Sequence, residues 1–315
     1  MDYDPILWWR NPLRKALLAI LAFSLFLAAG ISAQTVYKEG KAPEWAGDEL
    51  RVIMIGAHPD DAEFNGGGTA ALWAAAGAKV LLVAVTNGDA GHQREGGGAL
   101  ARRRAAEATR SAEILGGQWR TLGFHDGELV PSLEARKAVI RVIREWQADI
   151  VISHRPNDYH PDHRYTGQIV QDAAYMAAVP NITPETARVK SNPVFMYFAD
   201  HFKKPYPFEV DVAVDVDPVM DKKWGSIASM ESQMFEWSPW IGGYPVEVPA
   251  DKEARLSWLI QWRAPRMRNW TDKGREVLAK RYSQTHAGKV EFAEIFELCE
   301  YGRQPSKEEL WRLFP

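Results

Sequence analysis

The sequence predicts an α/β fold, with a Rossmann-like, mostly parallel sheet that carries helices on both of its faces. From residue 50 onward, short apolar runs alternate with longer segments of helical periodicity, which is the pattern of repeated βαβ units. Two polar motifs each follow an apolar run directly, as expected where strands end at the edge of such a sheet. With 315 residues, 46% of them hydrophobic, the chain can bury the core that this fold needs.

The expected elements follow one another in βαβ order. The apolar runs predict strands over 51–56, 79–86, 119–124, 148–153, 194–199 and 210–216. The segments of helical periodicity predict helices over 71–78, 99–117, 133–147 and about 165–178, and a further helix capped by Asp217. Beyond residue 235, Trp and Pro recur without a clear period, so we expect a more irregular, Trp-rich C-terminal portion.

The first 33 residues have the features of a signal peptide or a membrane anchor. Basic residues precede an apolar run over 16–30, and small residues follow it up to Ala33. Cleavage near Ala33 would give an exported protein, periplasmic or extracellular; an uncleaved run is near the lower limit for spanning a bilayer and would anchor the chain. Residues 34–315 are expected to form a single domain, with a catalytic core over about 50–235 and a C-terminal elaboration over about 236–315.

Composition narrows the possible partners. A net charge of −3 and a pI near 6.3 provide no basic surface for nucleic acid, so we expect no nucleic-acid partner. Cys299 is the only cysteine, which excludes an intramolecular disulfide and a cysteine-based zinc site. The 13 tryptophans fit either ordinary packing or stacking on sugar rings.

Two motifs about a hundred residues apart predict a metal site. AHPDDAE at 57–63 and HPDH at 160–163 follow the expected strands 51–56 and 148–153, and the carboxyl ends of parallel strands share one crevice. His58, Asp61 and His163 would supply two imidazole nitrogens and a carboxylate oxygen, a ligand set that holds catalytic Zn²⁺ and leaves a position for water. Helix caps and a proline turn are the alternative reading of these residues, but the coincidence of the two motifs favours a metal hydrolase.

Further motifs resemble those of a known family. AHPDDAEFNGGGT, TNGDAGH, Arg104 with Glu107, LGFHDGEL and HPDH follow in the order and rough spacing of the PIG-L/LmbE-like family of zinc-dependent N-deacetylases, chiefly over residues 50–180. The resemblance implies removal of an acetyl group from an N-acetylglucosamine-type sugar, oligosaccharide or glycoconjugate. It also implies one Zn²⁺ per chain, with other divalent ions possible.

The resemblance assigns roles to the remaining motif residues. Asp60 would act as general base on a Zn-bound water, and His160 would stabilise the tetrahedral oxyanion. From its position beside His160, Asp162 is expected to hold that imidazole by accepting its other N–H. Between the two motifs, the glycine-rich segment 88–98 is expected either to form a mobile rim of the site or to be an ordinary solvated connection.

Three further residues, Arg104, Asp126 and Tyr159, are expected to contact the substrate. The resemblance makes Arg104 a hydrogen-bond donor to the sugar, although it lies in an arginine run that a solvated helix face would also explain. Asp126 could accept sugar hydroxyls or form a turn, and Tyr159 could assist the oxyanion. Here the chain departs from its relatives, since Asp158 stands where some have tyrosine and Met230 where many have histidine.

Two other classes of function fit parts of this pattern. The same water and oxyanion site would serve a metal-dependent esterase or another amidase. A non-catalytic carbohydrate-binding protein is a weaker alternative, because binding alone would not require Asp60 beside the ligand Asp61.

Overall fold

The computed structural model describes residues 49–243 and 247–315, so the expected signal or anchor lies outside the described residues. Within those two ranges, no helix is both long enough and apolar enough to cross a membrane.

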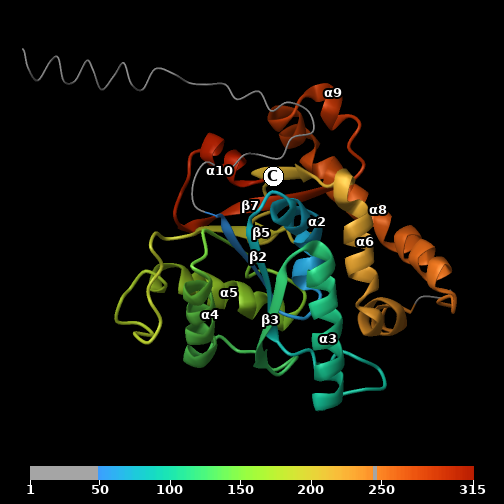
Figure 1. The fold of residues 1–315 in the computed structure, drawn as a ribbon, viewed down its shortest axis with the longest axis horizontal. Helices are drawn as coiled ribbons and strands as arrows, with labels where there is room; N and C mark the ends of the chain where they lie inside the picture. The colour runs from blue at the N-terminus through green and yellow to red at the C-terminus, as the bar shows by residue number, and fades with distance from the viewer. Residues whose placement is uncertain (1–48, 244–246) are drawn as a thin grey trace, which may run out of the picture. The chain divides into compact units, whose positions relative to one another are not determined.

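One seven-stranded sheet organises the described chain, with strand order β3-β2-β1-β4-β5-β7-β6 (Figure 1). Strands β1 to β5 run parallel, and β7 runs antiparallel to both of its neighbours. The predicted α/β fold with a mostly parallel sheet is therefore confirmed. The strands are β1 (Arg51–Gly56), β2 (Lys79–Thr86), β3 (Gln118–Phe124), β4 (Ile150–Ser153), β5 (Val194–Phe198), β6 (Val212–Asp215) and β7 (Ala293–Gly302).

Helices cover both faces of the sheet, as the buried side chains of β1 show. Val52 and Met54 belong to the apolar core under α2 and α6, whereas Ile53 and Ile55 belong to the core under α4 and α5. Successive strand residues point to opposite faces, so a strand covered on both sides must be apolar throughout. The helical segments are α2 (Asp61–Ala75), α3 (Gly97–Leu115), α4 (Leu133–Trp146), α5 (Pro161–Met176), η2 (Asp217–Val219), α6 (Met220–Ala228), η3 (Ser232–Trp237, a π-helix), α7 (Ser238–Ile241), α8 (Lys252–Arg281), α9 (Gln284–Ala287) and α10 (Lys307–Leu313).

Helix α2 begins at Asp61 and includes the glycines that we expected to precede it. Gly68 explains the difference, because a Cβ there would lie 2.7 Å from Cβ of Val216. Small residues therefore let this helix pack closely on its neighbours, which outweighs their low helix propensity. Asp217 does not cap α6 as expected, since its carboxylate accepts the backbone N–H groups of Glu291 and Phe292 instead.

The C-terminal portion is more regular than its sequence suggests. Helix α8 runs for 30 residues through Pro265, and its N-cap Asp251 accepts the backbone N–H of Ala254. Strand β7 lies between β5 and β6, so the expected elaboration supplies a strand of the sheet itself. Segments from both ends of the described chain therefore share one core.

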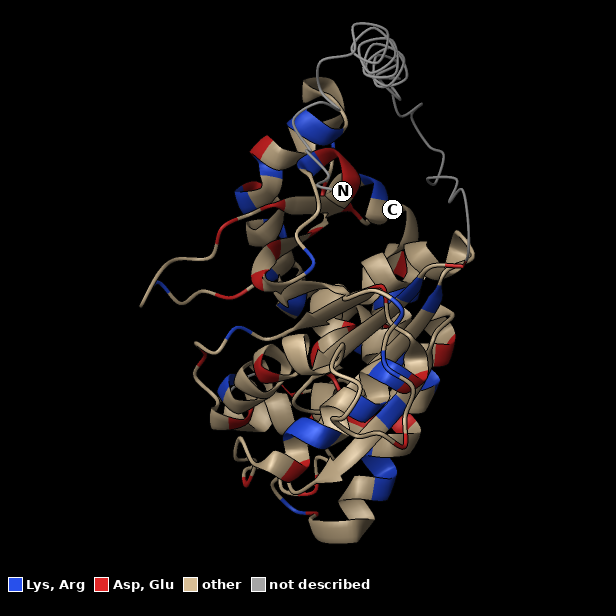
Figure 2. Cartoon of the chain, turned by 90° about the vertical axis from the view of Figure 1, so that its left-hand side faces the viewer, with Lys and Arg blue, Asp and Glu red and all other residues tan. Residues whose placement is uncertain are grey.

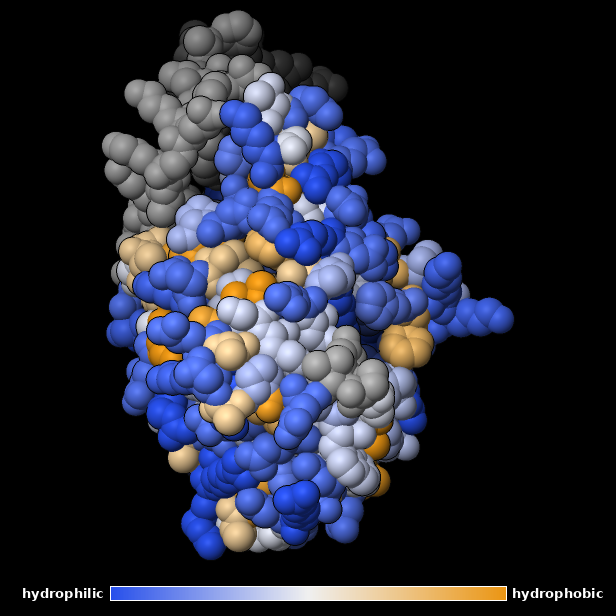
Figure 3. Space-filling model, turned by 90° about the vertical axis from the view of Figure 1, so that its right-hand side faces the viewer, coloured by the Kyte–Doolittle hydropathy of each residue, from blue (hydrophilic) through white to orange (hydrophobic). Residues whose placement is uncertain are grey.

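The surface carries both signs of charge. Figure 2 shows Lys and Arg interspersed with Asp and Glu over one side of the molecule. On the side that carries α8 in Figure 1, Figure 3 shows mostly hydrophilic residues with separate apolar spots between them.

The strand order fixes where a site can form. From β1 the chain crosses to β2 on one side, and from β4 it crosses to β5 on the other, while β1 and β4 lie side by side. A crevice therefore opens at the carboxyl ends of β1 and β4, the topological switch point at which open α/β sheets bind ligands.

Candidate active site

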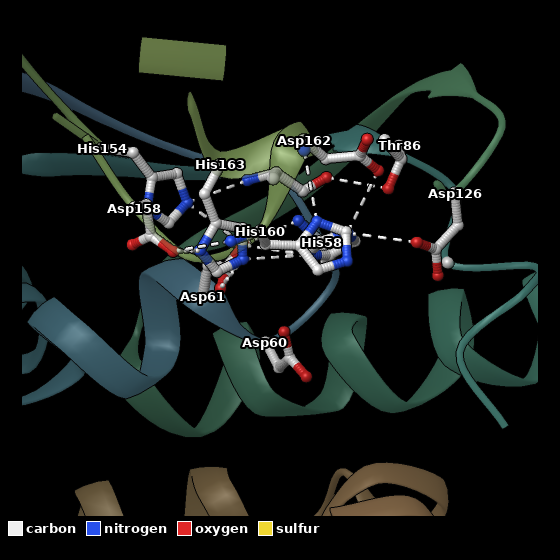
Figure 4. Close-up of polar contacts among 12 residues, drawn as sticks. His58, Asp60, Asp61, Thr86, Asp126, His154, Asp158, His160, Asp162 and His163 are labelled. Carbon is white, nitrogen blue, oxygen red and sulfur yellow. Dashed lines mark hydrogen bonds and ion pairs between the residues drawn. The ribbon is translucent and has the colours of Figure 1, made fainter. Parts of the chain in front are cut away.

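The two predicted motifs meet at this switch point (Figure 4). His58 lies in the short connection from β1 to α2, and Asp61 is the first residue of α2. Helix α5 begins at Pro161, about four residues before its predicted start, so Asp162 and His163 lie in its first turn. All three proposed ligands are buried or nearly so, and their side chains converge.

The three predicted ligands have the spacing of a tetrahedral metal site. His58 Nδ1 lies 3.2 Å from His163 Nε2, and His163 Nε2 lies 3.3 Å from Oδ1 of Asp61. His58 Nδ1 lies 3.5 Å from Oδ2 of the same carboxylate. Ligand bonds of about 2.0–2.1 Å, typical of zinc, give a tetrahedron with edges of about 3.3–3.4 Å. Each pair of these residues therefore lies near the edge length of a zinc tetrahedron, with the two Asp61 distances measured to different oxygens of its carboxylate.

The far side of each imidazole is held by a carboxylate. Nε2 of His58 lies 3.1 Å from Oδ1 of Asp126 and 3.3 Å from Oδ2 of Asp162. Nδ1 of His163 lies 3.1 Å from Oδ1 of Asp158. These carboxylates can accept the ring N–H groups, which leaves the lone pairs of His58 Nδ1 and His163 Nε2 facing one another, where both would bind a cation.

Asp162 therefore has a partner other than the one predicted. Its carboxylate meets His58 and the backbone N–H of Gly127, at 2.7 Å, whereas we expected it to hold His160. The reason is the early start of α5. It makes His160 the N-cap, whose Nδ1 accepts the backbone N–H of Asp162 at 3.2 Å.

The electrostatics of the cluster favour positive charge. Burial alone would lower the pKa of His58, but hydrogen bonds to Asp126 and Asp162 raise that pKa well above its usual value. Burial would also lower the pKa of His163, but the Asp61 carboxylate beside it raises that pKa above its usual value. Burial would raise the pKa of Asp61, yet His163 beside it helps to hold that pKa well below its usual value. A divalent cation would supply the positive charge that this arrangement attracts.

The Asp61 carboxylate is also fixed in orientation. Oδ2 accepts the backbone N–H of His58 at 2.8 Å and lies 3.2 Å from Nε2 of His154. A Cβ on Gly56 would lie 2.6 Å from Cβ of Asp61, so the end of β1 must be glycine for this approach. Neither His154 nor Asp158 belongs to the site predicted from the sequence. His154 directly follows β4, and Asp158 lies two residues before His160, which was the available signal.

Asp60 stands beside this network rather than within it, as Figure 4 shows. Burial raises the pKa of its carboxyl, and the positive charge of Arg104 opposes the shift. Nη2 of Arg104 lies 3.2 Å from Oδ2 of Asp60, and Nη1 lies 3.5 Å from Oδ2 of Asp126. A carboxylate close to the cluster with a raised pKa suits a general base.

Arg104 is buried, with 2% of its surface exposed, so the solvated-helix alternative is wrong for this residue. Two neighbouring arginines of the run, by contrast, reach solvent more freely. Nε of Arg104 has no hydrogen-bond partner among the described residues, although the side chain lines the cavity. Asp126 is buried between His58 and Arg104, and Tyr159 is 71% exposed at the cavity wall.

His160 presents its other ring nitrogen to the site. Burial and the neighbouring His58 lower the pKa of His160, which favours the neutral ring. Because Nδ1 accepts a backbone N–H, the proton of the neutral ring lies on Nε2. A ring nitrogen of His160 lies within 4.8 Å of those of His58 and His163.

The cluster forms the floor of a cavity of about 730 Å³. The glycine-rich segment 88–98 forms part of its rim and is docked against η3. His92 Nε2 lies 3.0 Å from a carboxylate oxygen of Glu236, and Gln233 donates to the carbonyl of Gly91 at 3.0 Å. Asp126, Phe198, Trp237 and Arg266 also line this space.

The fold and the site together define an α/β protein with two histidines and a carboxylate, spaced for a metal, at the switch point of a Rossmann-like sheet. The chain belongs to the PIG-L family, whose model, described as GlcNAc-PI de-N-acetylase, matches residues 53–174. It is 32% identical over 205 residues to diacetylchitobiose deacetylase of Thermococcus kodakarensis, covering 62% of this chain and 76% of that protein. The family predicted from the motifs is thus confirmed.

Other relatives agree on the fold and differ in activity. The solved structure of N,N'-diacetylchitobiose deacetylase from Pyrococcus horikoshii matches with a TM-score of 0.62 and 25% identity, covering 80% of this chain and 84% of that one. The chain is also 28% identical over 193 residues to 4-oxalmesaconate hydratase of Pseudomonas putida, covering 59% of this chain and 74% of that protein.

Proposed function

We propose that this protein is a metal-dependent N-deacetylase, which removes the acetyl group from an N-acetylglucosamine-type sugar or glycoconjugate. The observation that carries the proposal is the separation of two kinds of carboxylate. Asp61 faces the imidazoles at metal-ligand spacing, while Asp60 lies beside them as an independent base. Relatives named as deacetylases of an acetylated disaccharide support the choice of substrate class.

When bound, Zn²⁺ would polarise the amide carbonyl and lower the pKa of the attacking water. His58, Asp61 and His163 would hold the ion. Asp60 would accept the proton of the water, and its raised pKa suits it to pass that proton to the leaving amine.

His160 would donate a hydrogen bond from Nε2 to the carbonyl oxygen as negative charge develops there. A donor that meets charge only near the transition state raises the rate more than the affinity. Arg104, Asp126 and Tyr159 line the same cavity and would position the sugar around the acetamide.

The hydratase relative and the esterase alternative define the competing outcomes. Water addition to an unsaturated acid and ester hydrolysis would both use a base and an activated water. The test is release of acetate from N-acetylglucosamine, diacetylchitobiose and longer N-acetylated sugars, with and without a chelator. We expect chelator-sensitive release from N-acetyl sugars and little from matched O-acetyl sugars. Faster turnover of O-acetyl sugars would instead establish an esterase, and turnover of 4-oxalmesaconate alone would establish a hydratase.

We also propose export, with cleavage near Ala33, which would place the substrate outside the cytoplasm. Mass spectrometry of the mature N-terminus in the native host tests this. An intact N-terminus recovered in the membrane fraction would favour the anchor.

A further inference from the structure

One wall of the cavity is basic and comes from the C-terminal portion of the chain. Arg263 and Arg266 of α8 line the cavity, and His201, which follows β5, lines it beside them. Residues three apart on a helix lie on the same face, so both guanidinium groups reach the cavity together. This wall consists of residues that the chemistry of deacetylation does not use.

Both arginines are placed against a residue next to the metal cluster. The guanidinium carbon of Arg263 lies 5.0 Å from the ring centre of Phe64, and that of Arg266 lies 6.0 Å from the same ring. Phe64 follows Asp61 by three residues on α2 and also lines the cavity. The aromatic ring thus holds two positive groups within reach of a molecule whose acetamide lies at the cluster.

The carboxylates on this side of the cavity are already engaged. Asp200 accepts from Nη1 of Arg155 at 3.1 and 3.2 Å, and Asp158 meets His163 at 3.1 Å. Within residues 49–243 and 247–315, no carboxylate forms an ion pair with Arg266. The positive charge of Arg266 is therefore available to a ligand.

The basic character continues along the same face of α8. Lys273 lies two turns beyond Arg266, with its Nζ 4.4 Å from the ring centre of Trp270. The imidazole of His201 stacks on the same Trp270 ring, with ring centres 4.2 Å apart. The cavity itself, about 730 Å³, lies in the upper part of the usual range for small-molecule sites and has space beyond one sugar ring.

We propose that Arg263 and Arg266 form a subsite for an anionic group, a carboxylate or a phosphate, on the glycan that the enzyme deacetylates. This inference rests on the proposed function for the position of the acetamide, and it narrows the substrate class to acidic N-acetylated sugars. Arginine suits this role because its planar donors match the oxygens of either anion.

The test compares neutral and acidic sugars in the metal-loaded protein. We expect kcat/KM for N-acetylglucosamine 6-phosphate or for N-acetylmuramic acid to exceed that for N-acetylglucosamine. The acidic sugar with the higher kcat/KM shows whether the subsite prefers a phosphate or a carboxylate. Arg266→Gln should lower kcat/KM for the preferred acid about tenfold or more, the usual loss for a charged hydrogen bond, and leave that for the neutral sugar nearly unchanged. Arg263→Gln should act in the same direction.

Arg268→Gln is the matched control. Arg268 lies on α8 but pairs with the exposed Glu291 at 2.6 Å, so its loss changes the net charge equally without changing the cavity wall. If Arg268→Gln lowers the acidic rate as much as Arg266→Gln, the effect is one of net charge and the subsite is refuted.

A binding measurement separates this inference from the proposed activity. Calorimetry with N-acetylglucosamine 6-phosphate and N-acetylmuramic acid should show affinity for the preferred acid that falls about tenfold in Arg266→Gln, whether or not the sugar is hydrolysed. Binding that depends on Arg266 but is not followed by acetate release would refute the proposed deacetylase activity and support the anion subsite. Acetate release from neutral sugars, with Arg266→Gln indistinguishable from the unmodified protein for both acids, would keep the deacetylase and refute the subsite.

Discussion

The floor and the outer wall of the cavity are built in different ways. On the floor, His58, Asp61 and His163 each have a second partner that fixes the orientation of the side chain. The outer wall, made of Trp237 from η3 and the two arginines of α8, is held mainly by ring contacts. Catalysis needs the positions of its side chains fixed to a fraction of an ångström, whereas recognition of a flexible sugar does not. Under the proposed function, this difference would assign catalysis to the floor and substrate choice to the outer wall.

The largest effect should come from removing a floor ligand. His58→Ala or His163→Ala removes one of three donors, so the metal content should fall from about one zinc per chain to background, with activity lost. Elemental analysis measures this. Asp172→Ala, at an exposed position of α5, serves as the control. Full metal retention in both histidine variants would show that the floor is not the metal site.

Asp60→Asn should separate base from ligand on the same floor. We expect the metal to stay bound and turnover to fall by about two to four orders of magnitude, the usual contribution of a general base. Because burial raises the pKa of Asp60, the acidic limb of the pH profile should lie above the ordinary range of an aspartate. Near-normal turnover in Asp60→Asn would assign proton transfer to another group.

Glu63 tests the cost of burying a carboxyl on α2, two residues after Asp61. It is 1% exposed, and burial raises its pKa to about 8. The protonated form therefore stabilises the fold fully below the unfolded pKa of about 4.3, and this contribution is lost as the pH rises through the folded value. In the metal-free protein, stability should fall between about pH 5 and 8, by on the order of 3 kcal/mol at pH 7.

Urea denaturation at several pH values measures this contribution. Glu63→Gln should remove the pH-dependent fall, while Glu113→Gln, exposed on α3, should retain it. An unchanged pH dependence in Glu63→Gln would mean that Glu63 is ionised in the folded protein.

Asp158→Ala should have a moderate effect, because it removes a partner of a ligand and not the ligand. Loss of such a partner usually lowers metal affinity or activity about 10- to 100-fold. Asp158→Asn, which keeps an oxygen acceptor for His163, should recover part of the loss. Competition with a metal indicator measures the affinity, and equal affinities in all three proteins would contradict the role of Asp158.

The smallest effect is expected on the outer wall. Trp237→Ala should raise KM for an N-acetylated oligosaccharide about two- to tenfold, the range for an aromatic contact, with metal content and kcat nearly unchanged. A drop in kcat comparable to that of Asp60→Asn would remove the distinction between floor and outer wall.

The sequence alone determined the parallel half of the sheet and the residues that converge where β1 and β4 end. Apolar runs bounded by helical segments identified β1, β2, β4 and β5, because a strand covered on both faces must be apolar throughout. His58, Asp61 and His163 were identifiable because metal ligands lie in short motifs directly after such strands. The four-residue motifs HPDD and HPDH are enough to identify these three residues.

Only the tertiary structure decided which side chains meet across the motifs. Asp162 faces His58 and not His160, because the helix starts earlier than its periodicity indicates. Arg104 and its neighbours in the arginine run look alike in sequence, yet only packing against Gly88 and Asp60 buries this one. Helix α8 was missed because Pro265 interrupts its pattern and its apolar residues face two different cores. Contacts between segments a hundred or more residues apart depend on packing and strand order, and neither is encoded in a local pattern.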